Sequence, residues 1–232
     1  MQSIARRRLG LNGEVEFVQK DGPEGRILAV SNPTSSLKMK HAIVYSKADS
    51  LDPADVYHEM CRAKLYELGF KTTENAALVA LRDCAGEDPK YIFDANSAIV
   101  IVAEVYTSYL LYSYFPEESE KRRQEIVLRF ESSDALTSLH TQMGFWGTAG
   151  IGYYELAAER SGKEFPSKLV DAAIARASDG KAISEELEKV ENVLRELPMV
   201  STPIRDFSDS EQIQILSVIS ELFTAKTGIQ CE

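Results

Sequence analysis

The sequence has few of the side chains that most often bind metals or form covalent frameworks. It contains three histidines, three cysteines and one tryptophan among 232 residues. Cys61, Cys84 and Cys231 are odd in number and widely spaced, so they have neither the paired spacing of a zinc knuckle nor the even count of a disulfide framework. We therefore expect reduced thiols, as in a cytoplasmic protein.

Positive charge is also scarce, with 26 Lys and Arg residues against 36 Asp and Glu residues and a formal net charge of −10. Proteins that follow the phosphates of nucleic acids gather Lys and Arg on one surface, which makes nucleic acid an unsuitable partner here. The basic cluster at residues 5–10, "ARRRLG", is short. We interpret it as a solvated N-terminal arm.

Long apolar runs are missing as well. The most apolar stretch, residues 97–115, contains Glu104 near its middle. It falls short of the roughly 18 to 20 uninterrupted apolar residues that span a bilayer. No apolar segment typical of a secretion signal follows the early arginines. The sequence therefore predicts no membrane partner.

The N-terminal part of the chain has the pattern of β-strands. The segments "EVEFVQ", "GRILAVSN" and "KHAIVYSK" are rich in β-branched residues and are separated by the turn-forming segments "KDGPEG" and "NPTSS". These features predict three short strands in an antiparallel or mixed sheet. We expect the first two strands to form a hairpin across residues 21–23.

The periodicity changes at Asp52, where the sequence continues "DPADVYHEMCRAKLYELGF". Asp52 is suited to cap a helix and Pro53 to occupy its first position, while Gly69 is suited to end it. Apolar residues recur between them at the spacing of one helical face. The pattern predicts a helix of about four turns that follows directly from the third strand.

Most of the remaining sequence has a helical pattern. We predict a short helix around residues 74–82, a linker through "AGEDPKYIFD", and an apolar helix that is capped by Asp94 or Asn96 and ends before Pro116. A helix that is apolar on all sides belongs in the middle of the molecule. Further helices are predicted at residues 117–143, 148–160, 166–177, 184–197 and 209–226.

These elements predict an α+β fold that is mostly α. A small sheet near the N-terminus, with the helix that follows it, forms an α+β region at residues 1–116. A helical region, residues 117–232, packs against it as one unit.

The helix after the third strand carries a pair of residues known from metal sites, His58 and Glu59. In an H-E-x-x-H site, two imidazoles four residues apart bind one tetrahedral ion, and the adjacent Glu acts as general base on its water. Here Arg62 stands in place of the second His. A guanidinium cannot lose a proton to bind zinc. The pair alone is a weak signal, because such pairs are common on solvated helices.

The order of elements adds to this signal. A strand leads through a loop to the His-Glu helix, and a second helix, "IVIVAEVYTSYL", carries Glu104 in an apolar setting. This arrangement, over roughly residues 14–115, resembles the zincin metallopeptidases of the minimal gluzincin type, with a degenerate H-E-x-x-H motif. The resemblance implies zinc as cofactor, His58 and Glu104 as metal ligands, and catalytic positions at Glu59 and Arg62.

Arg62 changes what this site is expected to do. Two protein ligands are too few to hold zinc well, although Cys61 lies near enough on the helix to be considered as a third. Arg62 can instead place its charge where the metal would lie and pair with Glu104 or Glu59. The chain would then be a pseudoenzyme without peptidase activity. It would bind peptide or protein segments as an added strand at the sheet edge.

Two other functions fit the sequence. The first is an active zinc-dependent peptidase or hydrolase, in which His58, Glu104 and an unidentified third ligand hold the ion and Glu59 activates water. The second is a helical structural or oligomerisation module. In a purely structural protein, Arg62 and Glu67 would lie on a solvated face, and Glu104 would bond to a tyrosine such as Tyr109.

Overall fold

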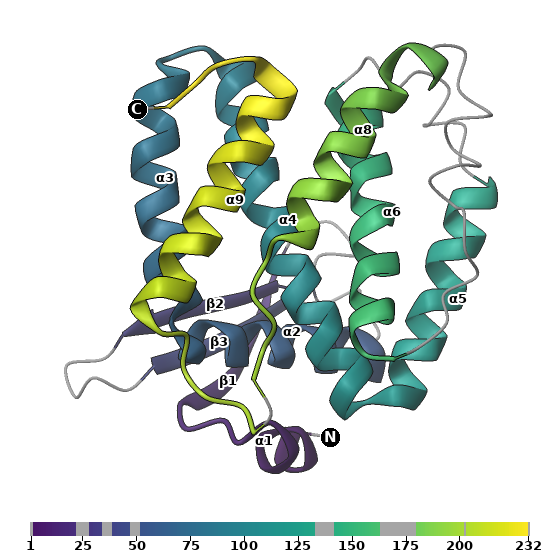
Figure 1. The fold of residues 1–232 in the computed structure, drawn as a ribbon. Helices are drawn as coiled ribbons and strands as arrows, with labels where there is room; N and C mark the ends of the chain where they lie inside the picture. Colours follow the sequence, from purple (N-terminus) through teal and green to yellow (C-terminus); the bar gives the residue numbers. More distant parts are fainter. Residues whose placement is uncertain are drawn as a thin grey trace.

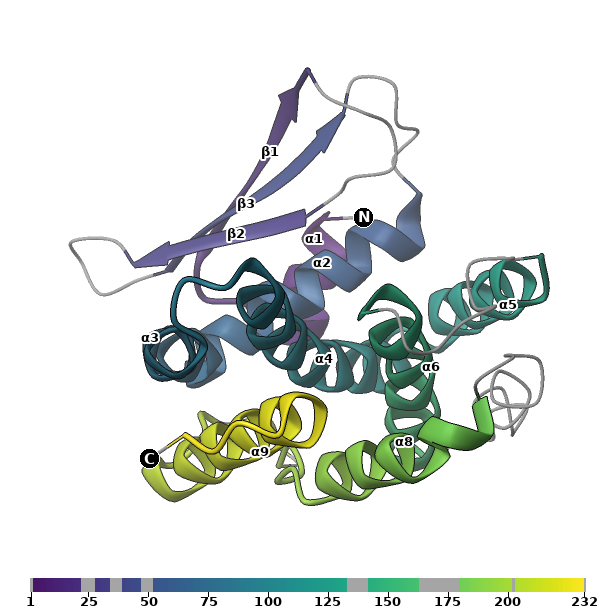
Figure 2. The same cartoon turned by 90° about the horizontal axis from the view of Figure 1, so that it is seen from above.

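The computed structural model describes residues 2–21, 28–33, 39–46, 52–132, 142–162, 180–201 and 203–231. It shows an α+β protein that is mostly α, in which a small sheet lies beside a larger group of helices (Figures 1 and 2). The predicted helix at residues 166–177 lies outside the described residues, as does the stretch 133–141 of the predicted helix 117–143.

The strands β1 (Glu14–Lys20), β2 (Leu28–Pro33) and β3 (Met39–Ser46) confirm the three predicted strands. Their order in the sheet is β1-β3-β2, with β1 parallel and β2 antiparallel to β3. The predicted hairpin between the first two strands is therefore wrong. The third strand separates them, and its side chains His41 and Ile43 are both fully buried. The charged strand β1 is left at one edge, where strand charges hinder further pairing.

The helices α1 (Gln2–Leu9), α2 (Pro53–Leu65), α3 (Lys71–Ala85) and α4 (Pro89–Tyr114) belong to the first half of the chain. The second half contributes α5 (Pro116–Ser132), α6 (Gln142–Arg160), α8 (Gly180–Arg195) and α9 (Asp209–Thr227). One hydrophobic core contains residues from both halves, from Ala5 to Phe223. Among the described residues, no helix combines the length and apolar character needed to cross a membrane.

A local signal starts α2 as the sequence predicts, whereas α2 ends at Leu65, before the predicted stop at Gly69. The side chain of Asp52 accepts a hydrogen bond from the backbone N of Ala54 at 2.8 Å, and Pro53 is the first helical residue. A π-helical segment, η1 (Tyr66–Phe70), follows α2 and contains Gly69 at a φ of 102°. This left-handed conformation suits glycine, so the chain turns there and continues as α3.

The central helix α4 begins earlier than predicted, because Asp88 rather than Asp94 caps it. Asp88 accepts a hydrogen bond from the backbone N of Lys90 at 2.8 Å, and Pro89 takes the first helical position. The start of α4 therefore has the same Asp cap and following proline as the start of α2. Because α4 begins at Pro89, the predicted linker "AGEDPKYIFD" is partly helical. The middle of α4 is buried against α2, α3, α6 and α9, which confirms a buried apolar helix.

Two further predictions are wrong, because packing of apolar side chains makes both segments helical. Residues 5–10 do not form a solvated arm, since they belong mostly to α1 and both Ala5 and Leu9 are buried. The helix predicted to begin at residue 148 begins at Gln142. Phe145 and Trp146 are buried there, and this packing offsets the low helix propensity of the nearby glycines.

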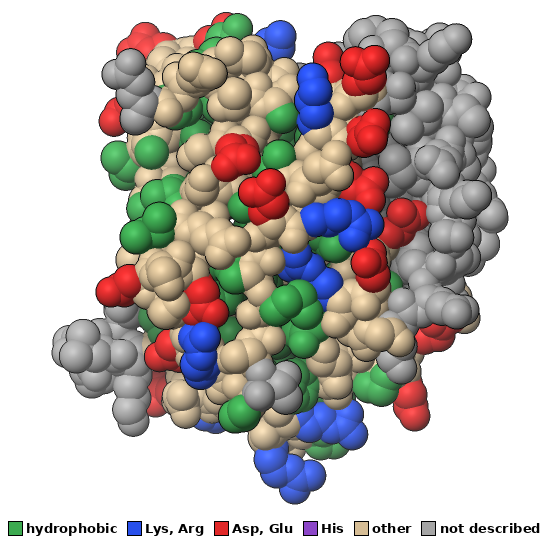
Figure 3. Space-filling model, viewed as in Figure 1, with side chains coloured by type: hydrophobic (Ala, Val, Ile, Leu, Met, Phe, Trp, Pro, Cys, Tyr) green, Lys and Arg blue, Asp and Glu red, His purple; other side chains and the backbone are tan. Residues whose placement is uncertain are grey.

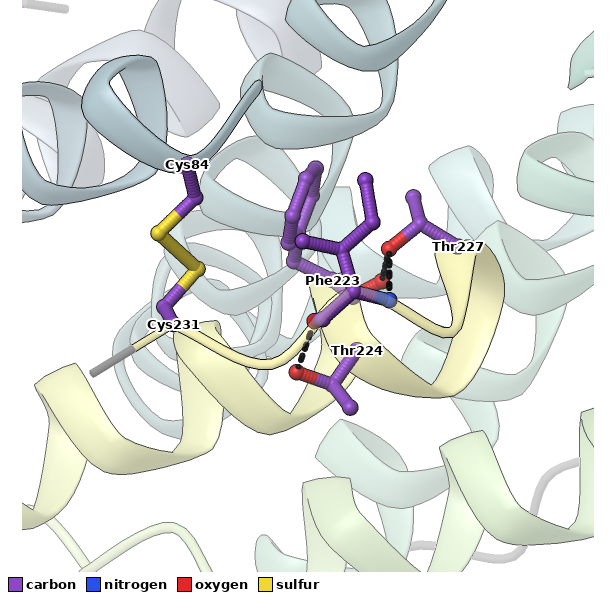
Figure 4. The surroundings of a disulfide bond; sticks show 6 residues. Cys84, Phe223, Thr224, Thr227 and Cys231 are labelled. Atoms are coloured by element: carbon purple, nitrogen blue, oxygen red, sulfur yellow. Dashed lines mark hydrogen bonds between the residues drawn. A yellow bond between two sulfur atoms is a disulfide. The ribbon is translucent and has the colours of Figure 1, made fainter. Parts of the chain in front are cut away.

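The cysteines are not all reduced thiols. Cys84, in the last turn of α3, forms a disulfide with Cys231 beyond α9, and only Cys61 is free (Figure 4). Beside the disulfide, the side chain of Thr224 donates a hydrogen bond to the backbone O of Ile229 at 2.8 Å. The prediction of reduced thiols is therefore wrong for this pair. Cysteine spacing no longer supports the expectation of a cytoplasmic location.

Candidate functional site

The helices α2 and α4 bring three predicted site residues together around one carboxylate. His58 and Arg62 lie on the same face of α2 because they are four residues apart. The Nε2 of His58 lies 3.1 Å from Oε2 of Glu104, and Nη1 of Arg62 donates to Oε1 of Glu104 at 2.5 Å. Each oxygen of the Glu104 carboxylate therefore has its own partner from α2.

These partners keep Glu104 ionised although it is buried. Burial alone would raise the pKa of this carboxyl, but the charge and hydrogen bond of His58, together with the charge of Arg62, lower it to about 2. Burial likewise opposes the charged form of Arg62, yet Glu104 and Tyr66 raise the pKa of Arg62 above its ordinary value. The site thus contains a buried ion pair with little access to water.

Arg62 also extends the site toward the surface. Its Nε donates to the hydroxyl of Tyr66 at 3.3 Å, and this hydroxyl donates to Oε1 of Glu74 at 3.4 Å. Glu74 in turn accepts a hydrogen bond from Lys71 at 2.7 Å. The remaining nitrogen of Arg62, Nη2, has no hydrogen-bond partner among the described residues. The Arg62 side chain is 16% exposed, so another group can reach it only over a small area.

The other predicted site residues lie nearby without completing a metal site. Oε1 of Glu59 is 4.0 Å from Nε2 of His58, which is beyond hydrogen-bonding distance. Cys61 is fully buried, and burial raises the pKa of its thiol, so the thiol remains protonated at neutral pH. Glu104, the predicted second ligand, is already bound to Arg62.

This donor set does not fit four-coordinate zinc. A metal-binding His usually donates its second ring N–H to a nearby acceptor, yet Nδ1 of the buried His58 has no such partner in the described part of the chain. In that part, no group of three or more His, Cys, Asp or Glu side chains has a geometry that could hold a metal. Arg62 adds a fixed positive charge beside the only two predicted ligands. The metal roles of His58 and Glu104 stay predictions.

The solvated-face interpretation is wrong for both Arg62 and Glu67. The side chain of Arg62 is only 16% exposed and pairs with Glu104, which does not bond to Tyr109. The Glu67 side chain is 6% exposed and accepts a hydrogen bond from the backbone N of Gly13 at 2.6 Å. It also lies 3.2 Å from Nε2 of His41. Glu67 therefore holds the loop before β1 against the end of α2.

Sequence reasoning missed two residues of the site. Tyr66 lies four residues after Arg62, so the helical spacing used for His58 and Arg62 would also have located it. Arg122, from α5, helps to lower the pKa of Glu104 and donates to Oδ1 of Asp55 at 2.7 Å. No local pattern connects Arg122 with α2, because the contact depends on how α5 packs.

The two buried carboxylates should make the protein sensitive to acid. Burial opposes their ionisation, but hydrogen bonds and nearby cations lower the pKa of both Glu67 and Glu104 to about 2 from 4.5. Stability from these groups is therefore present above about pH 4.5 and lost as the pH falls toward 2. Each should contribute on the order of 1–3 kcal/mol, with the smaller share from Glu67, whose charge solvent screens more.

Urea unfolding between pH 7 and pH 3 measures this loss. A Glu67→Gln variant removes one titrating group and should show a shallower decrease in the free energy of unfolding over the acid range. The same slope in the native and variant proteins would contradict a lowered pKa at Glu67.

Comparisons with known proteins give no relative from which a function could be transferred. No protein-family model, curated protein or solved structure matches the chain. The zincin resemblance therefore rests on the order of the elements, on the His-Glu helix and on the apolar helix that carries Glu104. The contacts of His58 and Arg62 with Glu104 are the feature of the molecule that bears on its function.

Proposed function

We propose that the chain is a zincin-like pseudoenzyme in which Arg62 takes the place of the metal, and that it binds extended peptide segments without cleaving them. The observation that carries this proposal is the pairing of Arg62 with Glu104 at 2.5 Å beside His58. A guanidinium neutralises the carboxylate as a metal would, yet it offers no position for an activated water. Glu59 then has no metal-bound water to deprotonate.

The sheet supplies a surface for an extended peptide. Strand β2 is an edge strand, antiparallel to β3, and α2 packs against both. Figure 2 shows β2 as the strand nearest to α3 and α4. An edge strand can pair with the backbone of an added peptide. The Nη2 of Arg62 is a donor suited to a peptide carbonyl.

Peptide binding can be tested with phage-displayed random heptapeptides selected on the native protein. The selected peptides should slow hydrogen exchange at residues 28–33, because an added strand protects the backbone of β2. They should bind about tenfold more weakly to Arg62→Lys, which keeps the charge but loses the planar donors. The exposed ion-pair residue Arg195 provides the matched control, Arg195→Lys, which should bind normally.

The same peptides test the loss of catalysis. Incubation with native protein and zinc should leave them intact. Cleavage that disappears in Glu59→Gln would contradict the pseudoenzyme proposal in favour of an active hydrolase. Failure to select any peptide that protects residues 28–33 would contradict binding at β2.

A further inference from the structure

A second reactive group of the molecule, outside the Arg62 site, is the disulfide between Cys84 and Cys231. It joins the last turn of α3 to the segment after α9, residues 228–231, and the two Cα atoms are 5.6 Å apart. Helices α3 and α9 lie side by side and form the surface on one side of the molecule (Figures 1 and 3). Both cysteines are half-buried rather than enclosed in the core. A thiol in solution can therefore approach the bond.

The disulfide is the bond that ties segment 228–231 to α3. The hydrogen bonds described for this segment run back to α9 instead. The backbone N of Gly228 donates to the backbone O of Thr224 at 2.8 Å, and the backbone N of Ile229 donates to Oγ1 of Thr227 at 3.1 Å. Apart from these bonds, the side chain of Ile229 packs against the core. Cleavage of the disulfide therefore leaves the segment with no bond to α3 among the described residues.

Helix α9 itself does not depend on the disulfide for its position. Leu222 and Phe223, near its C-terminal end, are fully buried in the core. The ammonium nitrogen of Lys226 lies 3.9 Å from the centroid of the Phe145 ring, which belongs to α6. Because these contacts remain when the disulfide opens, we expect the change to be local to the segment and the end of α3.

The third cysteine takes no part in this chemistry. The attacking species in thiol–disulfide exchange is a thiolate. Cys61 is fully buried in α2, and burial raises the pKa of its thiol, so the thiol remains protonated at neutral pH. Exchange in the folded protein is therefore confined to Cys84 and Cys231.

We propose that the Cys84–Cys231 disulfide is a redox switch, which a dithiol opens in the folded protein to release segment 228–231 from the end of α3. Accessible disulfides are the ones that thiols reduce most readily. One thiolate of the dithiol attacks a sulfur of the pair, the S–S bond breaks, and the displaced thiolate takes up a proton. The second thiol of the reagent then attacks the mixed disulfide and frees the other cysteine as a thiol.

The exchange is balanced and reversible. Two electrons and two protons pass to the protein, and the reagent leaves as a disulfide. The oxidised reagent reverses both steps and ties the segment to α3 again. The switch is independent of peptide binding at β2.

Opening the switch should also lower the stability of the whole protein. The disulfide joins residues that are 147 apart in sequence, so it strongly restricts the unfolded chain. Reduction should therefore lower the urea concentration at the midpoint of unfolding by about 1 M. Cys84→Ser should have the lower midpoint without any reductant and should show no further change with it. An unchanged midpoint of the native protein on reduction would contradict this role.

Alkylation of the folded protein tests the switch directly. The protein is incubated with dihydrolipoate, a small dithiol, then alkylated with N-ethylmaleimide, and the labels are located by mass spectrometry. We expect no label without the dithiol, labels on Cys84 and Cys231 with it, and a label on Cys61 only in urea. Exchange of the reduced protein into lipoate, the oxidised reagent, should remove both labels. Circular dichroism should show that the helix content stays unchanged throughout.

Hydrogen exchange then locates the structural change. The amides of residues 228–231 should exchange at least about tenfold faster in dihydrolipoate, whereas those of α2 should exchange as before. Cys84→Ser and Cys231→Ser should both show the fast exchange without reductant. Each variant removes the bond from a different side, so agreement between them excludes an effect of either new serine.

Three results would overturn the proposal. Labels on both cysteines without the dithiol would mean that the two are not linked. Labels that appear only in urea would mean that the disulfide is a permanent cross-link of the folded protein. Labelling with unchanged exchange at residues 228–231, or with faster exchange throughout α2, would mean that reduction does not release this segment locally.

Discussion

The Arg62→His variant is expected to bind one zinc ion per chain, and the native protein is expected to bind zinc at least about a hundredfold more weakly. The substitution places imidazoles at positions 58 and 62, four residues apart on one face of α2, beside Glu104. It also removes the permanent charge that now lies 2.5 Å from the carboxylate. Three ligands then leave the fourth position to water, as in catalytic zinc sites.

Isothermal titration with zinc measures both proteins. Two controls separate the causes: Arg62→Ala removes the repulsion without adding a ligand and should bind zinc only weakly. His58→Ala, added to Arg62→His, should abolish the new site. Tight stoichiometric binding by the native protein would favour the active-hydrolase alternative. If no variant bound zinc, His58 and Glu104 could not be metal ligands of a degenerate site.

The sequence located those parts of the fold that short-range signals determine. The N-terminal end of α2 follows from the cap by Asp52 and the proline after it, and the turn between η1 and α3 follows from Gly69, whose φ of 102° few other residues adopt. At the start of α9, the Ser-x-x-Glu spacing of Ser208 and Glu211, which is visible in the sequence, forms a capping box. Each of these signals acts within a few residues, so the surrounding fold hardly alters it.

Such short-range signals could not predict which distant segments of the chain pair with one another. The three strands were recognisable, but their order depends on which strand is most deeply buried, and that is decided by the helices packed against the sheet. The disulfide of Cys84 and Cys231 joins residues 147 apart in sequence. Cysteine spacing contains no information on that distance in space, because α3 and α9 become neighbours only in the folded chain.

The site itself was partly predictable for a physical reason. His58 and Arg62 share a helical face, and a lone carboxylate in an apolar helix requires a positive partner, which made Glu104 the expected contact. The sequence did not show that both α2 residues bind the same carboxylate. That arrangement depends on the crossing of α2 and α4, which brings His58 to 3.1 Å and Arg62 to 2.5 Å of it.

The buried ion pair predicts strong coupling between Arg62 and Glu104 in stability. Arg62→Met should lower the free energy of unfolding by about 3–5 kcal/mol, because it leaves Glu104 charged in a buried position with only His58 as a direct partner. Glu104→Leu should cost a similar amount, since it leaves the guanidinium without its carboxylate. The double variant replaces both charges by apolar groups and leaves no unpaired charge from this ion pair.

We therefore expect the double variant to be only about 1–2 kcal/mol less stable than the native protein, far less than the sum of the single losses. Urea unfolding of all four proteins measures this coupling. The matched control is the exposed pair of Arg195 and Glu191, at 45% and 48% side-chain exposure, whose removal should cost at most about 1 kcal/mol. Additive losses at Arg62 and Glu104 would mean that the two charges are stabilised independently, and the interpretation of Arg62 as a substitute for the metal would then lose its energetic basis.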